Sequence, residues 1–142
     1  MSLTMFAKTA RLLVPALFAA LLLPACAAKE AEEEQGMSVV VDLRDVHRCS
    51  RISPEIVIAG MPADTQFFDV RLVELGDEER FFGGGSWVND GSGVIPEGGL
   101  TRHYRGPCPP TGESRNYAFV VSAMNKGTMQ PLAVRLYHFT QE

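Results

Sequence analysis

The chain has 142 residues, of which 46% are hydrophobic and 21% charged, and its formal net charge is −4. This length corresponds to one domain, and the composition is that of a globular protein, which excludes collagen-like and wholly disordered classes. An acidic domain of this size is not expected to bind nucleic acid, because that recognition relies on basic side chains.

The first 25 residues have the pattern of a signal peptide. Residues 12–23 contain no charged side chain and follow two basic residues, Lys8 and Arg11. This apolar run is shorter than the roughly 20 residues that cross a bilayer. We therefore expect residues 1–25 to be a targeting segment that is removed, rather than a transmembrane anchor.

The end of this segment resembles the lipobox of bacterial lipoproteins. Leu23-Pro24-Ala25-Cys26 places a large aliphatic residue three positions before a cysteine and a small residue directly before it. In this interpretation Cys26 is the lipidated first residue of a periplasm-facing lipoprotein, and Ala27 after it implies the outer membrane. The alternative is an ordinary secretory signal cut at Ala25 or within 27–28. Both interpretations place the protein outside the cytoplasm, and the lipoprotein interpretation places it in the bacterial cell envelope.

Residues 26–36 predict a flexible acidic tether. After Cys26 the sequence AAKEAEEEQG is rich in Glu and holds no large apolar side chain. Such a stretch cannot bury enough surface to offset the entropy of ordering it. We interpret it as a spacer between an anchored Cys26 and a folded domain over residues 37–142.

Setting Cys26 aside leaves an even pair of cysteines, Cys49 and Cys108. Outside the cytoplasm such a pair favours a disulfide. A metal site is the alternative, with His47 and His103 as the nearest companions, but the paired Cys or His spacing that metal sites favour is missing. The sequence therefore predicts a disulfide, with no metal and no cofactor.

From residue 37 onward the sequence predicts strands separated by turns. The apolar residues of 66–75 alternate with charged ones at a period of two, and 132–140 shows the one wet face of a sheet edge. The predicted strands are 37–43, 55–59, 66–75, 116–123 and 132–140. The predicted turns are Gly83-Gly84-Gly85, Asn89-Asp90-Gly91, Gly98-Gly99 and Pro107 to Pro110. This pattern is typical of a mostly β domain with two packed sheets.

The last of these turns resembles a signature of the phosphatidylethanolamine-binding protein family, whose bacterial members are also described as Raf-kinase-inhibitor-like. The signature reads Tyr104-Arg105-Gly106-Pro107-Cys108-Pro109-Pro110-x-Gly112, followed by Tyr117-x-Phe119. Supporting pieces occur in the family's order: Ser53-Pro54, Gly60-Met61-Pro62 with Thr65, Trp87, and Ile95-Pro96-x-Gly98. The resemblance implies a Greek-key-type β-sandwich with a small pocket at one end for anionic or phosphate-bearing head groups. In this chain the sandwich is shortened and the family's C-terminal helix is missing.

The chain departs from the family at residues that bind the anion. Glu74-Leu75-Gly76-Asp77 replaces an Asp-Pro-Asp-Ala-Pro stretch, and Ser86 replaces the histidine before the tryptophan. The His-Arg-Tyr after the proline loop becomes Arg115-Asn116-Tyr117. A guanidinium is a permanent, forked donor to phosphate or carboxylate. Arg115 is therefore a candidate to replace the missing histidine as the anion anchor.

The candidate ligand-binding residues come from the proline loop and its neighbours. Each has a structural alternative, because the loop can simply close the sandwich, Arg115 can be a surface arginine, and Tyr117 and Trp87 can be packing aromatics. The candidates are Ser86, Trp87, Gly106, Pro107, Pro109, Pro110, Arg115 and Tyr117.

No catalytic motif accompanies these residues. The histidines His47, His103 and His138 lie in separate segments, and neither a Gly-x-Ser-x-Gly elbow nor a phosphate-binding loop occurs. The sequence therefore predicts a non-catalytic binding module of the envelope, with a small anionic ligand. The alternative is an interaction or structural lipoprotein with a degenerate pocket, which contacts another envelope protein.

Lipidation of Cys26 can be tested with the variant Cys26→Ala. We expect this variant to leave the membrane fraction and appear in soluble form, because stable anchoring needs the several acyl chains that a lipoprotein cysteine carries. Fractionation of cells that express the variant or the parent chain measures this. Unchanged membrane association of the variant would contradict the lipoprotein prediction.

Overall fold

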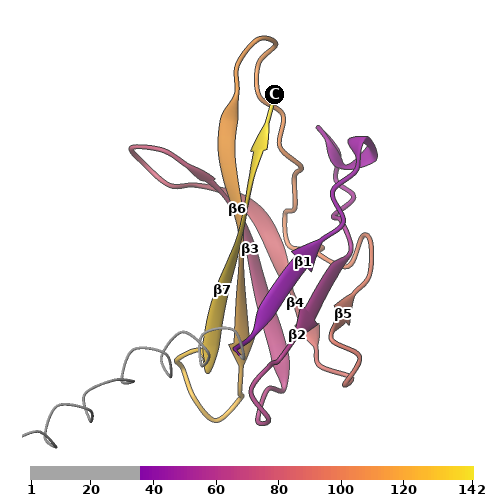
Figure 1. The fold of residues 1–142 in the computed structure, drawn as a ribbon, viewed down its shortest axis with the longest axis vertical. Helices are drawn as coiled ribbons and strands as arrows, with labels where there is room; N and C mark the ends of the chain where they lie inside the picture. The colour runs from indigo at the N-terminus through magenta and orange to yellow at the C-terminus, as the bar shows by residue number, and fades with distance from the viewer. Residues whose placement is uncertain (1–35) are drawn as a thin grey trace, which may run out of the picture. The chain divides into compact units, whose positions relative to one another are not determined.

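The computed structural model describes residues 36–142, which form two antiparallel sheets (Figure 1). The predicted signal peptide, Cys26 and all of the tether before Gly36 lie outside the described residues. A single turn of 3-10 helix, η1, covers Asp45–His47. The strands are β1 (Ser38–Val41), β2 (Ile56–Ala59), β3 (Phe67–Leu75), β4 (Arg80–Val88), β5 (Val94–Ile95), β6 (Arg115–Met124) and β7 (Ala133–Gln141).

The strand order confirms the predicted mostly β sandwich. One sheet has the order β1-β2-β5 and the other the order β4-β3-β6-β7. The chain therefore leaves the larger sheet after β4, contributes β5 to the smaller one, and returns beside β3, a Greek-key type of connection. Within residues 36–142, β7 is the last element and no helix follows it, as the prediction without a C-terminal helix requires. Within residues 36–142 no helix is long and apolar enough to cross a membrane.

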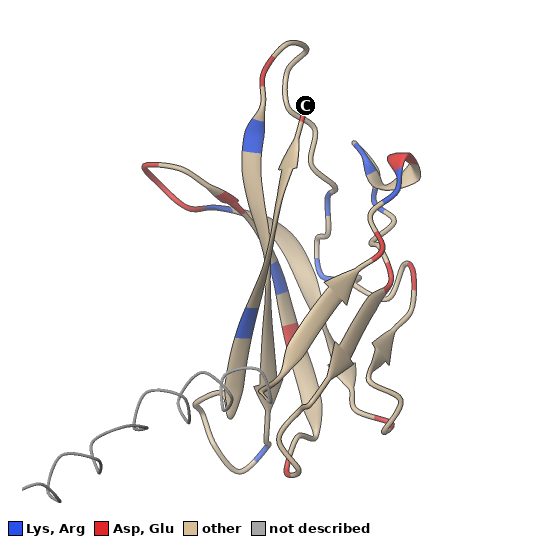
Figure 2. Ribbon diagram, in the orientation of Figure 1, with Lys and Arg blue, Asp and Glu red and all other residues tan. Residues whose placement is uncertain are grey.

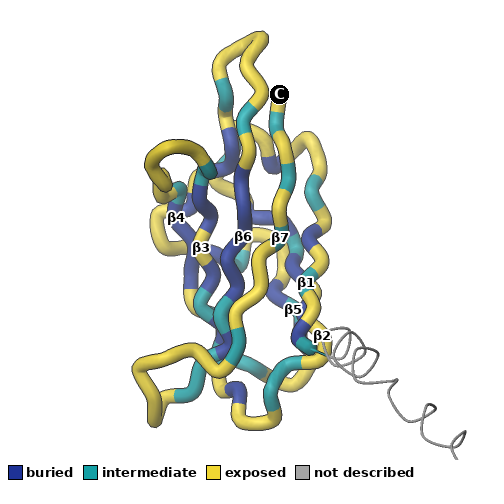
Figure 3. The backbone as a smooth tube through the Cα atoms, turned by 60° about the vertical axis from the view of Figure 1, so that its left-hand side comes forward, coloured by how far each residue is buried: buried dark blue, intermediate teal, exposed yellow. Residues whose placement is uncertain are grey.

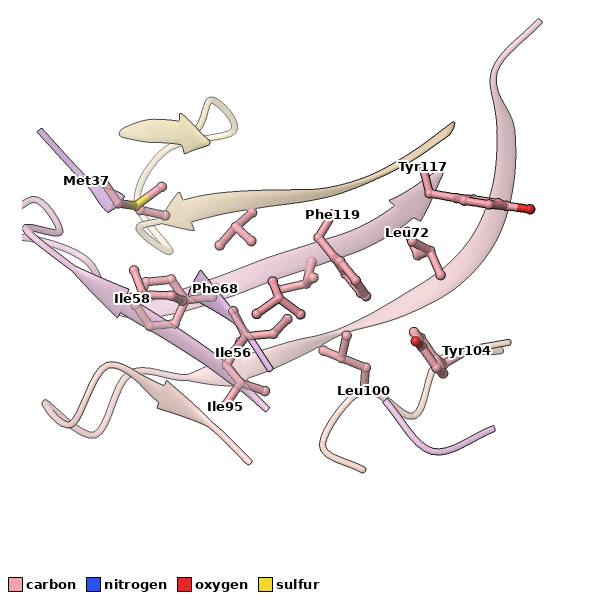
Figure 4. Packing of buried hydrophobic residues seen from close by; sticks show 14 residues of the cluster. Met37, Ile56, Ile58, Phe68, Leu72, Ile95, Leu100, Tyr104, Tyr117 and Phe119 are labelled. Carbon is pink, nitrogen blue, oxygen red and sulfur yellow. The ribbon is translucent and has the colours of Figure 1, made fainter. Parts of the chain in front are cut away.

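The core lies between the two sheets. Phe68, Val70 and Leu72 of β3 alternate toward the same interior as Tyr117 and Phe119 of β6. Ile56, Ile58 and Ile95 face them from the smaller sheet (Figure 4). Each of these side chains is almost fully buried, and burying one contributes about 1.5 to 3 kcal/mol. The period-two pattern of the sequence thus places one face of each long strand in the core.

All five predicted strands are present, with boundaries within two residues of the prediction. Two further strands were not predicted. β5 has only two residues and is too short to show a period. β4 contains Gly83-Gly84-Gly85, so the turn predicted at these glycines is wrong.

The glycines of β4 do not form a turn. They leave room for the backbone of neighbouring segments. A side chain at Gly84 would overlap the carbonyl oxygen of Val70 on β3, and one at Gly83 would overlap the backbone of His103 and Tyr104. Gly83 also has a φ of 89°, which favours glycine. The glycines are therefore needed because the backbone of a neighbouring segment approaches β4 too closely for any side chain.

The predicted disulfide between Cys49 and Cys108 is confirmed. The two Cα atoms are 4.6 Å apart and the bond closes a separation of 59 residues. It joins the segment after η1 to the proline loop, next to a backbone hydrogen bond from the Cys49 N–H to the Pro107 carbonyl at 3.0 Å.

We expect the double variant Cys49→Ser, Cys108→Ser to lose about 4 kcal/mol of unfolding free energy, because loop-closure entropy returns to the unfolded chain. Chemical denaturation under non-reducing conditions measures this difference. The parent chain with added reductant is the control and should lose a similar amount. Equal stability of the oxidised parent and the variant would contradict the prediction.

Candidate functional site

The proline loop is fixed in place from one side. In addition to the disulfide, the Gly106 N–H donates to the Ser50 carbonyl at 2.6 Å. Gly106 has no room for a side chain because the His47 carbonyl lies against it. Gly106 and Pro107 are buried, whereas Pro110 is exposed. The predicted turn at Pro107 to Pro110 is thus tied to the segment that follows η1.

Arg115 is engaged by two carboxylates. Its guanidinium donates to Glu113 at 2.6 Å and to Glu74 at 2.9 Å. The hydrogen bonds to Glu113 and then to Glu74 raise the pKa of Arg115 above its usual value. Arg80 approaches Glu74 from β4 at 3.7 Å. The charge of Arg115 is therefore largely compensated within the fold, which weakens its case as an anion anchor.

Tyr117 lies in the core next to this ionic cluster. Its ring is 1% exposed and makes an edge contact with Phe82, with ring centres 5.7 Å apart. Phe139 stacks on it at 5.6 Å. Burial, and secondarily the negative charge of Glu74, raise the pKa of the Tyr117 hydroxyl. The contacts of Tyr117 match the alternative of a packing aromatic.

Ser86 and Trp87 lie far from Arg115. Ser86 pairs with Asp69 on β3, whereas Asn116, next to Arg115, pairs with Leu75. These register positions are six residues apart along β3, or roughly 20 Å. Trp87 packs against the core, and Ser86 is exposed on the opposite face of the sheet. The structure therefore does not bring the predicted ligand-binding residues together at one place.

The structure instead assembles a basic hollow beside the start of β4. Its volume is about 310 Å³, which is at the small end of the range for ligand pockets. Three of its lining side chains are basic. The lining residues are Arg80, Phe81, Phe82, Gly83, His103 and Arg105.

The segment 102–105 forms one wall of this hollow because it runs along the edge of β4. Arg102 and Gly84 exchange two backbone hydrogen bonds, at 3.0 and 2.9 Å, and the Arg105 N–H donates to the Phe82 carbonyl at 2.9 Å. Backbone pairing therefore sets His103 and Arg105 opposite Arg80. The guanidinium carbon of Arg80 lies 5.9 Å from the centre of the Phe82 ring, in the range of a cation–π contact.

The charges around the hollow leave it basic. Within residues 36–142, Arg105 and His103 form no ion pair, and Arg80 has only the distant contact to Glu74. Three consecutive acidic residues, Asp77, Glu78 and Glu79, precede Arg80 at the tip of the β3–β4 hairpin (Figure 2), and they do not line the hollow. A phosphate or carboxylate is the ligand that two guanidinium groups and an imidazole recognise.

Neither Arg80 nor Arg105 is among the candidates predicted from the sequence, and His103 is considered there only as a metal or catalytic residue. A usable signal was present, because His103 and Arg105 flank the first residue of the proline-loop signature. The signature gives no indication of Arg80, because Arg80 lies 23 positions before His103 in the sequence. Only the pairing of residues 102–105 with β4 brings the two together.

A second hollow, of about 390 Å³, lies at the same end of the larger sheet, where β3, β6 and β7 meet. Its polar lining comes from Asn116, His138 and Thr140, and Leu75 adds an apolar side chain. The Thr140 hydroxyl donates to the Asn116 side-chain oxygen at 2.8 Å. Within residues 36–142 no group of three His, Cys, Asp or Glu side chains could hold a metal ion.

His47 is a buried titratable group near the proline loop. Its Nδ1 accepts the backbone N–H of Arg44 at 3.0 Å, so the neutral ring carries its proton on Nε2, which lies 2.9 Å from Glu97. Arg44 also forms an ion pair with Glu97. Burial, and then the charge of Arg44, lower the pKa of His47. Glu97 alone would favour a protonated ring, but Nδ1 could then no longer accept from Arg44.

Comparisons with known proteins support the fold. Neither a protein-family model nor a curated protein sequence matches the chain. Among solved structures, E. coli YbcL, described as a new member of the mammalian PEBP family, matches with a TM-score of 0.58. The match covers 75% of this chain and 98% of YbcL at 15% identity. The chain has the phosphatidylethanolamine-binding-protein fold.

This fold places the proline loop and the basic hollow on the same connection. In the phosphatidylethanolamine-binding-protein fold of this chain, residues 96–114 link β5 to β6 and carry the proline loop and one wall of the hollow. At 15% identity the likeness to YbcL concerns the fold alone, so the chemistry of the site rests on the side chains described above.

The lowered pKa of His47 makes stability depend on pH. Because the unfolded chain binds a proton more readily than the folded one, the stabilisation is complete above the unfolded pKa of about 6.5 and is lost as pH falls below it. We expect the unfolding free energy to decrease between pH 7.5 and 5.5, measured by chemical denaturation. In His47→Gln, which cannot titrate, the decrease should be smaller. An equal decrease in both chains would contradict this role of His47.

Proposed function

We propose that the protein is a non-catalytic binding module of the bacterial envelope, anchored through Cys26, whose ligand is a small anion or a phosphate-bearing group. The observation that supports this proposal is the basic hollow lined by Arg80, His103 and Arg105. The ligand is bound there, and not at Arg115, because the guanidinium of Arg115 already has two carboxylate partners.

The hollow favours a single small group over a large ligand. Its volume of about 310 Å³ and its position at the surface leave room for a phosphate, a phosphomonoester or a carboxylate. The rings of Phe81 and Phe82 add an apolar surface on which the non-ionic part of such a ligand can rest. Each charge-assisted hydrogen bond contributes about 1.5 to 3 kcal/mol, so the affinity for a lone phosphate is modest.

Phosphate titration of the full chain in detergent, followed by amide chemical shifts, tests this proposal. We expect shifts to concentrate at the start of β4 and at residues 102–106. The variant Arg105→Gln should weaken binding roughly ten- to hundredfold, because it removes one charge-assisted contact. Arg80→Gln should act in the same direction.

Arg71→Gln is the matched control, because Arg71 is exposed on β3, lies outside the hollow and carries the same charge. An equal loss of binding in this variant would indicate non-specific attraction. Absence of phosphate shifts at the hollow would favour the alternative, an interaction lipoprotein that keeps the fold without a working pocket.

A further inference from the structure

β7 is an edge strand whose outer side has no backbone partner within residues 36–142. It pairs with β6 continuously, from Arg115 opposite Gln141 to Ala123 opposite Ala133, and no register shift interrupts this pairing. β1 packs near β7, but no backbone hydrogen bond joins the two strands. The outward N–H and C=O groups of β7 therefore form an open pairing edge.

The other sheet edges of the described domain are short or covered. β4, at the far edge of the same sheet, is covered at Phe82 and Gly84 by the backbone of Arg102 and Arg105. In the smaller sheet, the edge strands β1 and β5 have four and two residues. β7 has nine residues. It is the one long edge that the described part of the chain leaves open.

β7 also lacks the features that prevent edge pairing. Such edges are usually protected by proline, lysine, a bulge or several charges. The sequence AVRLYHFTQ has no proline or lysine, and Arg135 is its one permanent charge (Figure 2). Val134 is 36% exposed and Leu136 48%. Figure 3 shows β7 exposed along most of its length beside the buried β6.

We propose that the partner of this edge is a second copy of the chain, paired through β7 in the antiparallel sense about a two-fold axis at Leu136. This pairing continues the four-stranded sheet of one copy into that of the other. It is isologous, so the same strand serves on both sides and the assembly closes as a dimer.

The side chains of β7 fit their own copies in this register. Leu136 lies opposite Leu136 of the second copy, so two exposed apolar side chains cover each other. Arg135, whose guanidinium bonds only to the neighbouring Val134 carbonyl in the described chain, lies opposite Tyr137 of the second copy. Cation–π contacts and aliphatic pairs of this kind stabilise antiparallel strands. An axis at Arg135 itself would place like charges opposite each other, which is unfavourable.

The full chain in its own membrane, with Leu136→Cys and a short bis-maleimide cross-linker, tests this pairing. The two introduced thiols would lie about 5 Å apart across the axis. We expect a cross-linked dimer on denaturing gels. Thr140→Cys is the matched control, because it is exposed on the same face of β7, yet its two copies would be ~26 Å apart. The parent chain, which retains Cys26, gives the background.

A pair of variants extends the test if Leu136→Cys disturbs the edge. Val134→Cys and His138→Cys would lie opposite each other, so a mixture of the two differently tagged chains should cross-link more than either chain alone. Equal cross-linking at 136 and 140, or none above background in both experiments, would overturn the proposal. A product of Leu136→Cys with a different protein, without dimer, would also overturn it. Phosphate binding at the hollow is unaffected by any of these outcomes.

Discussion

The arrangement of this domain depends on how closely the backbone of residues 101–106 approaches its neighbours. Gly83 admits that backbone on the β4 side, and Gly106 admits the segment after η1. A side chain at either position would force the connection outward. The disulfide at Cys108 then fixes its far end. Covering of the β4 edge, the position of the proline loop and the wall of the basic hollow all follow from these contacts.

The distribution of charge follows from the same register. Glu74 lies where β3, β4 and β6 are adjacent, and it therefore meets both Arg115 and Arg80. Arg105 follows the covered edge on the other side of β4 and has no carboxylate partner in the described chain. Arg115 and Arg105 thus differ in their availability to a ligand. Arg115 is paired with Glu74 and Glu113, whereas Arg105 has no carboxylate partner in the described chain.

The sequence predicts the strands better than the site. Burial on one face leaves a period of two, which identified 66–75 and the wet edge at 132–140. The period of two did not identify β4, because its three glycines are equally typical of a turn and of a close backbone contact. Only the segment that packs against β4 in the fold distinguishes the two cases. The resemblance placed Arg115 and Ser86 in one pocket, but the register separates them by roughly 20 Å. Pairing across β3 decides which residues meet, and this information is not local in the sequence.

The connection that protects one edge of the larger sheet leaves the other edge open. Residues 102–105 act as an additional short strand for β4, and within residues 36–142 no equivalent segment pairs with the outer side of β7. The basic hollow lies along β4, and β4 and β7 are separated by three strand spacings, or about 14 Å. Pairing of two copies through β7 therefore leaves the hollow of each copy accessible. The anion site proposed at the covered edge and the pairing proposed at the open edge therefore do not exclude each other.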